Sequence, residues 1–254
     1  MLTSDSLLSR DTDRRPRIGI GCGADRTKVL RSRAKAEAAG FTGVAVYDDP
    51  DRLALDLREG RIDAAVRGDM DSNRAMAAVR REFGVGKVLR AAFIEPAGGN
   101  MFLLAPVGID EGWTAEEKLE LARLGGAALR RLGISSPAIG IMSGGRASDR
   151  GRMAEVDRTI DIAQRVVRTL SDEGIQARDV QILIENASRE CDMIIAPDGI
   201  SGNLIFRSLH FLGGAKALGA PVLNIGRTYI DTSRAKESYF DSIALAAALV
   251  SRRD

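Results

Sequence analysis

The sequence predicts an α/β protein with a largely parallel sheet covered by helices on both faces. Short apolar runs such as GVAVY, AIGIM and DMIIA alternate with longer helical stretches along the chain. Successive strand–helix units produce this alternation. The 254 residues are 44% hydrophobic and 28% charged, an ordinary globular composition that supplies ample material for a core. This length allows one large domain or two small ones.

The elements follow from apolar runs, turn residues and caps. Strands are predicted at 17–21, 43–47, 62–66, 90–95, 100–104, 138–142, 181–185, 192–196 and 221–225. Helices are predicted at 26–39, 50–58, 73–83, 114–132, 152–173, 203–212 and 238–252. The helix at 114–132 has the clearest signals, because Thr114 and Glu117 form a capping-box pattern and Gly133 stops it. The polar segment 1–16 is interpreted as a mobile tail.

Composition excludes several classes of function. A formal net charge of +2 does not suit a nucleic-acid-binding protein. Two widely separated cysteines form neither a zinc spacing nor a disulfide framework, which favours the reducing cytoplasm. No apolar stretch is long enough for a signal peptide or a membrane span, so we expect a cytoplasmic protein with no membrane partner.

Ligands of parallel sheets bind beyond the carboxyl ends of the strands, so loops after strands are the candidate sites. The glycine-rich segment 19–23 (GIGCG) lacks the last glycine of a dinucleotide fingerprint, and a tight turn is favoured there. The loop 143–152 (SGGRASDRGR) contains Gly144, Arg146 and Arg150. It suits an anion-binding loop and a solvated basic loop equally well.

The segment after the strand 192–196 is the sharpest candidate. Its members, which lead into a helix, are Asp198, Gly199, Ser201, Gly202 and Asn203. Free backbone N–H groups at a helix start bind phosphate, and glycines allow a close approach. An ordinary capped helix explains the same residues equally well.

A fourth candidate lies near the C-terminus. Ser233 and Arg234 place a hydroxyl beside a guanidinium, which together suit a carbonyl and a phosphate. Asp241 is a candidate general base, although the pattern SYFD at 238–241 favours a helix cap instead.

The blocks PDGISGNLIFRSLHFLGGAKALGAP, DTSRAKESYFDSIALA and RIDAAVRGD resemble the phosphate acetyltransferase and phosphate butyryltransferase superfamily. The blocks PVGIDEG, SGGRASDRGR and APDGISGNLIFR are similar to its methanogenesis marker protein 4 branch, also called MtxX and described as phosphotransacetylase-like. Some members of that branch carry the label of a methyltransferase subunit. The resemblance covers roughly residues 17–254.

The resemblance implies an isocitrate/isopropylmalate dehydrogenase-like fold of two α/β/α lobes with a cleft between them. The first lobe would comprise 17–133 and 228–254, and the second 134–227. Ser233 and Arg234 would contact the thioester carbonyl and the phosphate. Asp241 is the nearest equivalent of the family's base, at a spacing about one residue off. The loop 198–203 would line the substrate pocket, and the family implies a homodimer.

We therefore expect transfer of an acyl or related group between a coenzyme A-type thiol and phosphate or a phosphorylated small molecule. No tightly bound cofactor and no metal site are predicted. The alternatives are a methyltransferase-associated protein of methanogenesis and a non-catalytic ligand-binding accessory protein. The sequence has no glycine-rich methyl-donor fingerprint, and its single histidine, His210, excludes a corrinoid motif. We also expect 199–203, 143–152 and the Ser233–Arg234 pair to meet in one cleft.

Overall fold

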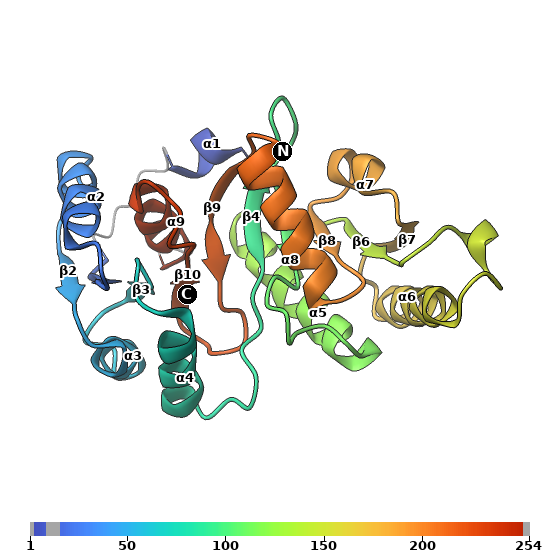
Figure 1. Cartoon of the computed structure of the whole chain (residues 1–254), viewed down its shortest axis with the longest axis horizontal. Coiled ribbons are helices and arrows are strands. Elements are labelled where there is room, and N and C mark those ends of the chain that lie inside the picture. The colour runs from blue at the N-terminus through green and yellow to red at the C-terminus, as the bar shows by residue number, and fades with distance from the viewer. Residues whose placement is uncertain (1–2, 9–15, 251–254) are drawn as a thin grey trace. The chain divides into compact units, whose positions relative to one another are not determined.

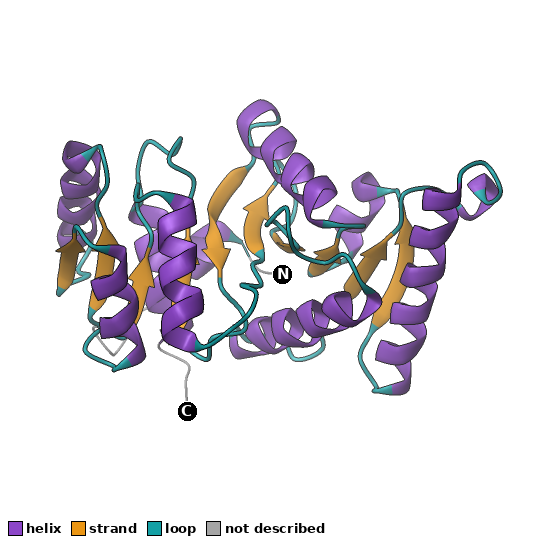
Figure 2. Ribbon diagram, turned by 60° about the horizontal axis from the view of Figure 1, so that its bottom comes forward, coloured by secondary structure: helices purple, strands orange, loops and turns teal. Residues whose placement is uncertain are grey.

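The computed structural model describes residues 3–8 and 16–250 and confirms a mixed α/β fold (Figures 1 and 2). The chain divides into two compact units. Unit 1 is built on Leu89–Ala217, and unit 2 on Asp5–Val88 together with the chain from Leu218 onward. None of the helices within the described ranges is long and apolar enough to cross a membrane.

Unit 2 is built on the strand order β2-β1-β3-β10-β9. The strands are β1 Ile18–Gly21, β2 Val44–Tyr47, β3 Ala64–Val66, β9 Lys216–Pro221 and β10 Thr228–Asp231. All neighbours in this order pair in parallel except β9 and β10. The carboxyl ends of β1, β2, β3 and β10 therefore meet at one edge of the sheet.

Four helices cover the sheet of unit 2. They are α2 Arg26–Ala38, α3 Pro50–Arg58, α4 Ser72–Phe83 and α9 Phe240–Val250. An aspartate caps each of the first three: Asp25, Asp49 and Asp71 accept backbone N–H groups of the first turn. These carboxylates satisfy donors that a helix start leaves free.

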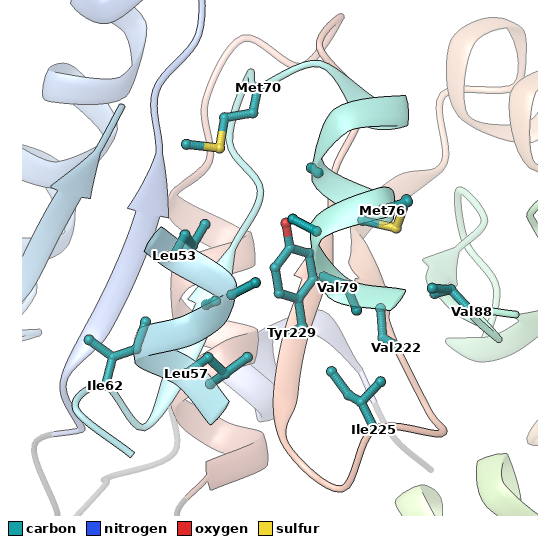
Figure 3. Close-up of a cluster of buried hydrophobic side chains, with 14 residues drawn as sticks. Leu53, Leu57, Ile62, Met70, Met76, Val79, Val88, Val222, Ile225 and Tyr229 are labelled. Atoms are coloured by element: carbon teal, nitrogen blue, oxygen red, sulfur yellow. The ribbon is translucent and has the colours of Figure 1, made fainter. Parts of the chain in front are cut away.

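Helices α3 and α4 pack together on one face of this sheet, and α2 and α9 pack together on the other (Figure 1). Figure 3 shows the cluster on the α3–α4 side, where Leu53, Leu57, Val79 and Tyr229 lie together. On the other face, eight consecutive residues of α9 from Ser242 to Leu249 are buried. Because most of them are small, the helix fits closely, so the apolar C-terminal segment belongs to the core of its own unit.

Unit 1 contains the order β4-β5-β8-β6-β7. The strands are β4 Ala92–Glu95, β5 Phe102–Ala105, β6 Ile139–Met142, β7 Ala177–Gln181 and β8 Met193–Ile195. Only β4 runs antiparallel to its neighbour in this order. The helical elements are α5 Ala115–Arg131, η1 Ala147–Asp149, α6 Ala154–Asp172, α7 Ile184–Glu190, α8 Gly199–Arg207 and the π-helical turn η2 Ser208–Leu212. Helices α5 and α8 lie on opposite sides of these strands (Figure 2).

Several predicted elements are wrong in detail. The run at 181–185 is not a strand, because Gln181 has a positive φ of 55° and ends β7, after which α7 begins at Ile184. The strand β7 precedes this run and is half-exposed, so its sequence ARDVQ lacks an apolar signal. The strand predicted at 221–225 lies earlier, as β9, whose sequence KALGAP has low β propensity.

The N-terminal segment differs from the predicted mobile tail where it is described. Helix α1 spans Ser4–Leu8, and Leu7 is buried. The rest of the predicted tail, residues 1–2 and 9–15, lies outside the described residues, whereas Pro16 is described and buried.

The two units change over at Val88/Leu89 and at Ala217/Leu218. The lobes expected from the sequence, 17–133 plus 228–254 and 134–227, stay a prediction. In the structure, the segment 89–133 belongs to the compact unit that contains β8. The reason is direct, because β5 pairs with β8 and α5 packs against β8.

Candidate functional site

Three loops of unit 1 lie at the same edge of its sheet. Strand β8 pairs in parallel with both β5 and β6. The loops that follow these strands, 106–112, 197–203 and 143–152, therefore begin side by side. Two of them contain residues that the sequence predicted to bind substrate.

The loop after β8 leads directly into α8, which begins at Gly199 rather than at Asn203. Asp198 is the N-cap, and its carboxylate accepts hydrogen bonds from the Ser201 backbone N–H at 2.8 Å and from the Ser201 hydroxyl at 3.1 Å. The capped-helix interpretation is thus correct for these two side chains. Because the Asp198 carboxylate and the Ser201 hydroxyl bond each other, neither side chain is free to bind a ligand while the cap is intact.

The glycines of this loop allow it to pack against the loop after β5. A Cβ at Gly199 would overlap the carbonyl oxygen of Gly108, and a Cβ at Gly202 would overlap that of Pro106. The Asn203 amide donates to the carbonyl of Val107 at 2.8 Å. We call the segments 106–112 and 197–203 together the double loop. The two segments are held together by close contact between their backbones.

Lys118 of α5 ties the two halves of the double loop together. Its side chain is buried, and its ammonium donates to the carbonyl oxygens of Gly112 and, at 2.6 Å, Pro197. Burial lowers the pKa of Lys118 to about 8, against the opposing attraction of Asp198 and Glu117. A buried cation therefore stands directly behind the cap of α8.

A buried carboxylate supports the same loop. Glu111 is fully buried and accepts from the backbone N–H and the Nε of Arg90, at 2.8 and 2.7 Å. Burial raises the pKa of Glu111, and the charge and hydrogen bonds of Arg90 oppose that rise. Gly108 leaves the space that this pair fills, because a Cβ there would overlap both side chains.

Sequence reasoning missed both Lys118 and Glu111. A signal for Lys118 was present, because it shares the helical spacing of Ala115, Leu119 and Ala122 on the buried face of α5. A lysine on an apolar face needs a specific partner. The partners lie on other segments of the chain, so no local pattern could identify them.

The loop 143–152 is largely satisfied by its own neighbours. The backbone N–H of Gly144 donates to Thr159 at 2.8 Å, and that of Arg146 donates to Asp149 at 2.8 Å. The Arg150 guanidinium pairs with Asp161 at 2.8 Å, with both side chains about half exposed. Such an exposed pair is worth little, so it does not prevent Arg150 from taking another partner.

At the corresponding edge of unit 2, the Ser233–Arg234 turn follows β10. The Arg234 side chain is 63% exposed and lies 3.8 Å from the Asp71 carboxylate. Its backbone carbonyl accepts from the ammonium of Lys28 at 2.9 Å. The Ser233 hydroxyl accepts from the Ala235 backbone N–H at 3.2 Å, which closes the turn.

The base of this turn is anchored in the unit. Arg67 and Asp231 form a buried ion pair, and Arg67 also donates to the carbonyl of Met70. The Thr232 hydroxyl donates to the carbonyl of Gly68 at 2.6 Å. The turn after β10 is thus fixed to the loop after β3, while the Arg234 guanidinium extends outward.

Asp241 lies in the first turn of α9, and the Ser238 hydroxyl accepts from the Phe240 backbone N–H at 3.2 Å. The capping-box interpretation of this segment stays a prediction. The charge of Asp241 acts on Lys236, whose pKa burial lowers to about 8 while that charge opposes the lowering. A role for Asp241 as general base stays a prediction.

The glycine-rich segment 19–23 does not present free backbone donors. The Asp69 carboxylate accepts from the backbone N–H groups of Gly23 and Asp25, both at 2.6 Å. A Cβ at Gly21 or Gly23 would overlap the backbone carbonyl of Arg67 or Asp69, respectively. These contacts support the tight-turn interpretation, because the chain's own carboxylate occupies the place of an anion.

The predicted residues thus fall into two groups. Those at 144–150 and 198–203 lie in unit 1, and Ser233, Arg234 and Asp241 lie in unit 2. That the two groups face one cleft stays a prediction. Among residues 3–8 and 16–250, no three His, Cys, Asp or Glu side chains are grouped to hold a metal ion.

Two proteins of methanogenic archaea are similar to the whole chain. The "Putative methyltransferase mtx subunit X" of Methanosarcina mazei is 39% identical over 96% of this chain and 94% of its own. An uncharacterized methyltransferase of Methanopyrus kandleri is 40% identical over 92% of this chain and 98% of its own. No protein-family model matches the chain.

Solved structures with the same fold are more distant in sequence. A branched-chain phosphotransacylase from Enterococcus faecalis superposes with a TM-score of 0.74 at 16% identity, covering 93% of this chain and 100% of its own. A phosphotransacetylase from Staphylococcus aureus gives a TM-score of 0.70 at 12% identity, covering 97% and 98%. At such identities the likeness shows a shared fold.

Proposed function

Because the chain belongs to the family of the mtx subunit X proteins, we propose that it is a phosphotransacetylase-like transferase. It moves an acyl or related group between a coenzyme A-type thiol and phosphate or a phosphorylated small molecule. The fold shared with two phosphotransacylases supports this proposal. The finer arrangement of two isocitrate/isopropylmalate dehydrogenase-like lobes with a substrate cleft is part of the same proposal, as is a cytoplasmic location.

One observation carries the proposal: the Arg234 guanidinium projects from a rigidly anchored turn. Its carbonyl is held by Lys28, and its neighbour Thr232 is held by Gly68. The guanidinium itself is 63% exposed and forms a long, exposed ion pair with Asp71 at 3.8 Å, which contributes little and exchanges for a phosphate. A fixed backbone with an available fork of N–H donors suits bidentate recognition of phosphate.

The proposed chemistry follows from this arrangement. The thiolate sulfur attacks the carbonyl carbon of an acyl phosphate, and the carbonyl electron pair moves onto oxygen. When that pair returns, the carbon–oxygen bond to phosphate breaks, and phosphate leaves with its bonding electrons. Ser233 and Arg234 stabilise the developing negative charge. The thiol proton goes to a base, for which Asp241 remains the proposed residue.

We assign the double loop and the loop 143–152 to the remainder of the substrate. Gly199, Gly202 and Asn203 fix the start of α8 at the sheet edge where this part of the substrate would bind. Arg146 and Arg150 supply positive charge on the neighbouring loop. The exposed ion pair of Arg150 with Asp161 exchanges readily for a phosphate.

A second candidate function rests on the names of the relatives, both of which are called methyltransferases. In that case the chain is a methyltransferase-associated protein of methanogenesis. A third possibility is an accessory protein that binds the ligand without turnover. Arsenate-dependent breakdown of acyl-coenzyme A across chain lengths separates them. Turnover supports acyl transfer, and binding without turnover supports the accessory role. If the protein neither turns over nor binds acyl-coenzyme A, the methyltransferase association remains.

Arg234→Lys tests the proposed site directly. The substitution keeps the charge but removes the planar fork, so affinity for inorganic phosphate should fall about ten- to a hundredfold. Calorimetric titration measures the affinity, and thermal melts confirm folding. Arg81→Lys is the matched control, because Arg81 is an exposed arginine of unit 2 paired with Asp51. Equal affinities for Arg234→Lys and the wild type would reject the site.

We also propose a homodimer. Exposed apolar side chains gather along α8 and η2: Ile200, Leu204, Phe211 and Leu212. Apolar side chains repeated along one helical segment favour an association surface, and closed pairing of two identical chains is the commonest symmetric assembly.

A further inference from the structure

The Tyr239 hydroxyl lacks a hydrogen-bond partner. The side chain is 0% exposed, and its hydroxyl is the single fully buried side-chain polar atom without a partner among the described residues. Leaving a buried polar group unsatisfied costs free energy, so natural proteins seldom do so without a reason. An orphaned hydroxyl of this kind indicates a partner from outside the chain.

The surroundings place Tyr239 beside the Ser233–Arg234 turn. Its backbone N–H donates to the Ser32 hydroxyl of α2 at 2.9 Å. The ammonium of Lys28, on the same helix, lies 5.2 Å from the centre of the tyrosine ring. That same ammonium donates to the carbonyl of Arg234 at 2.9 Å. One lysine therefore joins the ring of Tyr239 to the turn that carries Arg234.

The charged groups around the hydroxyl come from the loops at this edge of unit 2. Burial raises the pKa of Tyr239, Asp69 and Asp25 raise it further, and Arg67 and Arg234 oppose the rise. The hydroxyl therefore stays protonated near neutral pH and acts as a hydrogen-bond donor.

The acidic groups nearby are already engaged. Asp69 accepts from two backbone N–H groups, and Asp25 accepts from the Lys28 backbone N–H at 2.9 Å. Arg67 is paired with Asp231, whereas most of the Arg234 side chain is exposed. Through Lys28, a donor without an acceptor is therefore joined to the turn that carries an exposed guanidinium. An anion bound at this turn would offer an acceptor to both groups.

We propose that the Tyr239 hydroxyl is a ligand-binding group that donates to an oxygen of the phosphate held by Arg234. This inference rests on the proposed function, because it adds one contact, from the buried Tyr239 hydroxyl, to the Ser233–Arg234 site. The ligand class it implies is a phosphate or phosphoryl ester small enough to reach the buried hydroxyl.

Tyr239→Phe tests the proposal, because it removes the oxygen alone. The ligand-free variant should melt at the same temperature as the wild type or higher, since the lost hydroxyl had no partner. Affinity for inorganic phosphate, and for acetyl phosphate as a second probe, should fall about tenfold or more by calorimetry. Tyr47→Phe is the matched control. The Tyr47 hydroxyl donates to Asp56 at 2.9 Å, so that variant should lose stability and keep its phosphate affinity.

Each contrary result is distinct. If Arg234→Lys weakens phosphate binding but Tyr239→Phe does not, the site stands and the tyrosine contact is overturned. If ligand-free Tyr239→Phe is less stable than the wild type, the hydroxyl has a partner already, such as a buried water, and the proposal is overturned. If the wild-type protein binds neither probe, the proposed function loses its site and the inference is lost with it.

Discussion

Lys118→Met would remove the cation that joins the two halves of the double loop while keeping a side chain of similar length. In the wild type, the ammonium donates to the carbonyls of Gly112 and Pro197 from a position that is 2% exposed. Methionine cannot donate to either carbonyl. The variant therefore leaves two acceptors without their buried donor, and it also removes the cost of burying a charge.

The two effects oppose each other, and their sizes decide the outcome. Hydrogen bonds to a charged group contribute roughly 1.5–3 kcal/mol each, so two contribute roughly 3–6 kcal/mol. Lowering the Lys118 pKa from 10.5 to about 8 corresponds to about 3 kcal/mol against the charged form. Near pH 7 the free energy of unfolding should therefore fall by about 0–3 kcal/mol in Lys118→Met.

The pH dependence is the sharper test. Between the folded pKa of about 8 and the unfolded value of 10.5, the unfolded state binds more protons at Lys118 than the folded state does. Wild-type stability therefore gains from this residue as the pH rises through that window, whereas the methionine variant gains nothing there. The gap in unfolding free energy between the two proteins should widen by up to about 3 kcal/mol from pH 7 to pH 10.

Urea unfolding of both proteins across this pH range measures the gap. Lys236 also has a pKa lowered to about 8, but it titrates in both proteins and its effect cancels in the difference. Hydrogen exchange at 197–203 reports the local consequence, since the loop should open more often in the variant. A gap that stays constant with pH would refute a buried, desolvated charge at Lys118.

Two further predictions concern packing and assembly. Gly199→Ala should destabilise the protein by about 1–3 kcal/mol or more, because its Cβ would overlap the Gly108 carbonyl. Gly86→Ala, with nothing within 4 Å of the added Cβ, should be nearly neutral, and equal urea midpoints for the two variants would count against the double loop. Light scattering at micromolar concentration should give the mass of a dimer, and Leu204→Lys should shift it toward the monomer. A wild-type monomer would reject the proposed assembly.

Local patterns in the sequence predicted β5, β6 and β8, the strands that position the unit 1 loops. They placed the start of α8 at Asn203 instead of Gly199 and missed β10, which precedes the Ser233–Arg234 turn. The buried run before Ala196 is β8, and Asp198 caps α8 as its residue type suggests. The apolar runs predicted strands correctly because such strands are buried on both faces of a parallel sheet. Edge elements such as β7 were missed, since half-exposed strands mix charged and apolar residues without a clear period.

The tertiary partners could not be predicted, because they are distant in the sequence. Lys118 bonds Pro197 across 79 positions, and Asp69 bonds Gly23 across 46. No local pattern encodes which backbone carbonyl a buried lysine meets. Lys118 was identifiable as a charged residue on an apolar face, and its role became clear only with the fold.

The contacts of the glycine-rich segment 19–23 bear on where the proposed anion would bind at this edge of unit 2. Its backbone donors at Gly23 and Asp25 are filled by the Asp69 carboxylate, 2.6 Å from each. A phosphate would have to displace a carboxylate held in place by the chain, which is costly compared with binding at open groups. The side chains left for an anion here are the Arg234 guanidinium, whose exposed pair with Asp71 is 3.8 Å long, and the buried Tyr239 hydroxyl, which has no partner. We therefore propose that an anion at this edge is recognised by side chains of the last strand–helix connection rather than by the glycine turn.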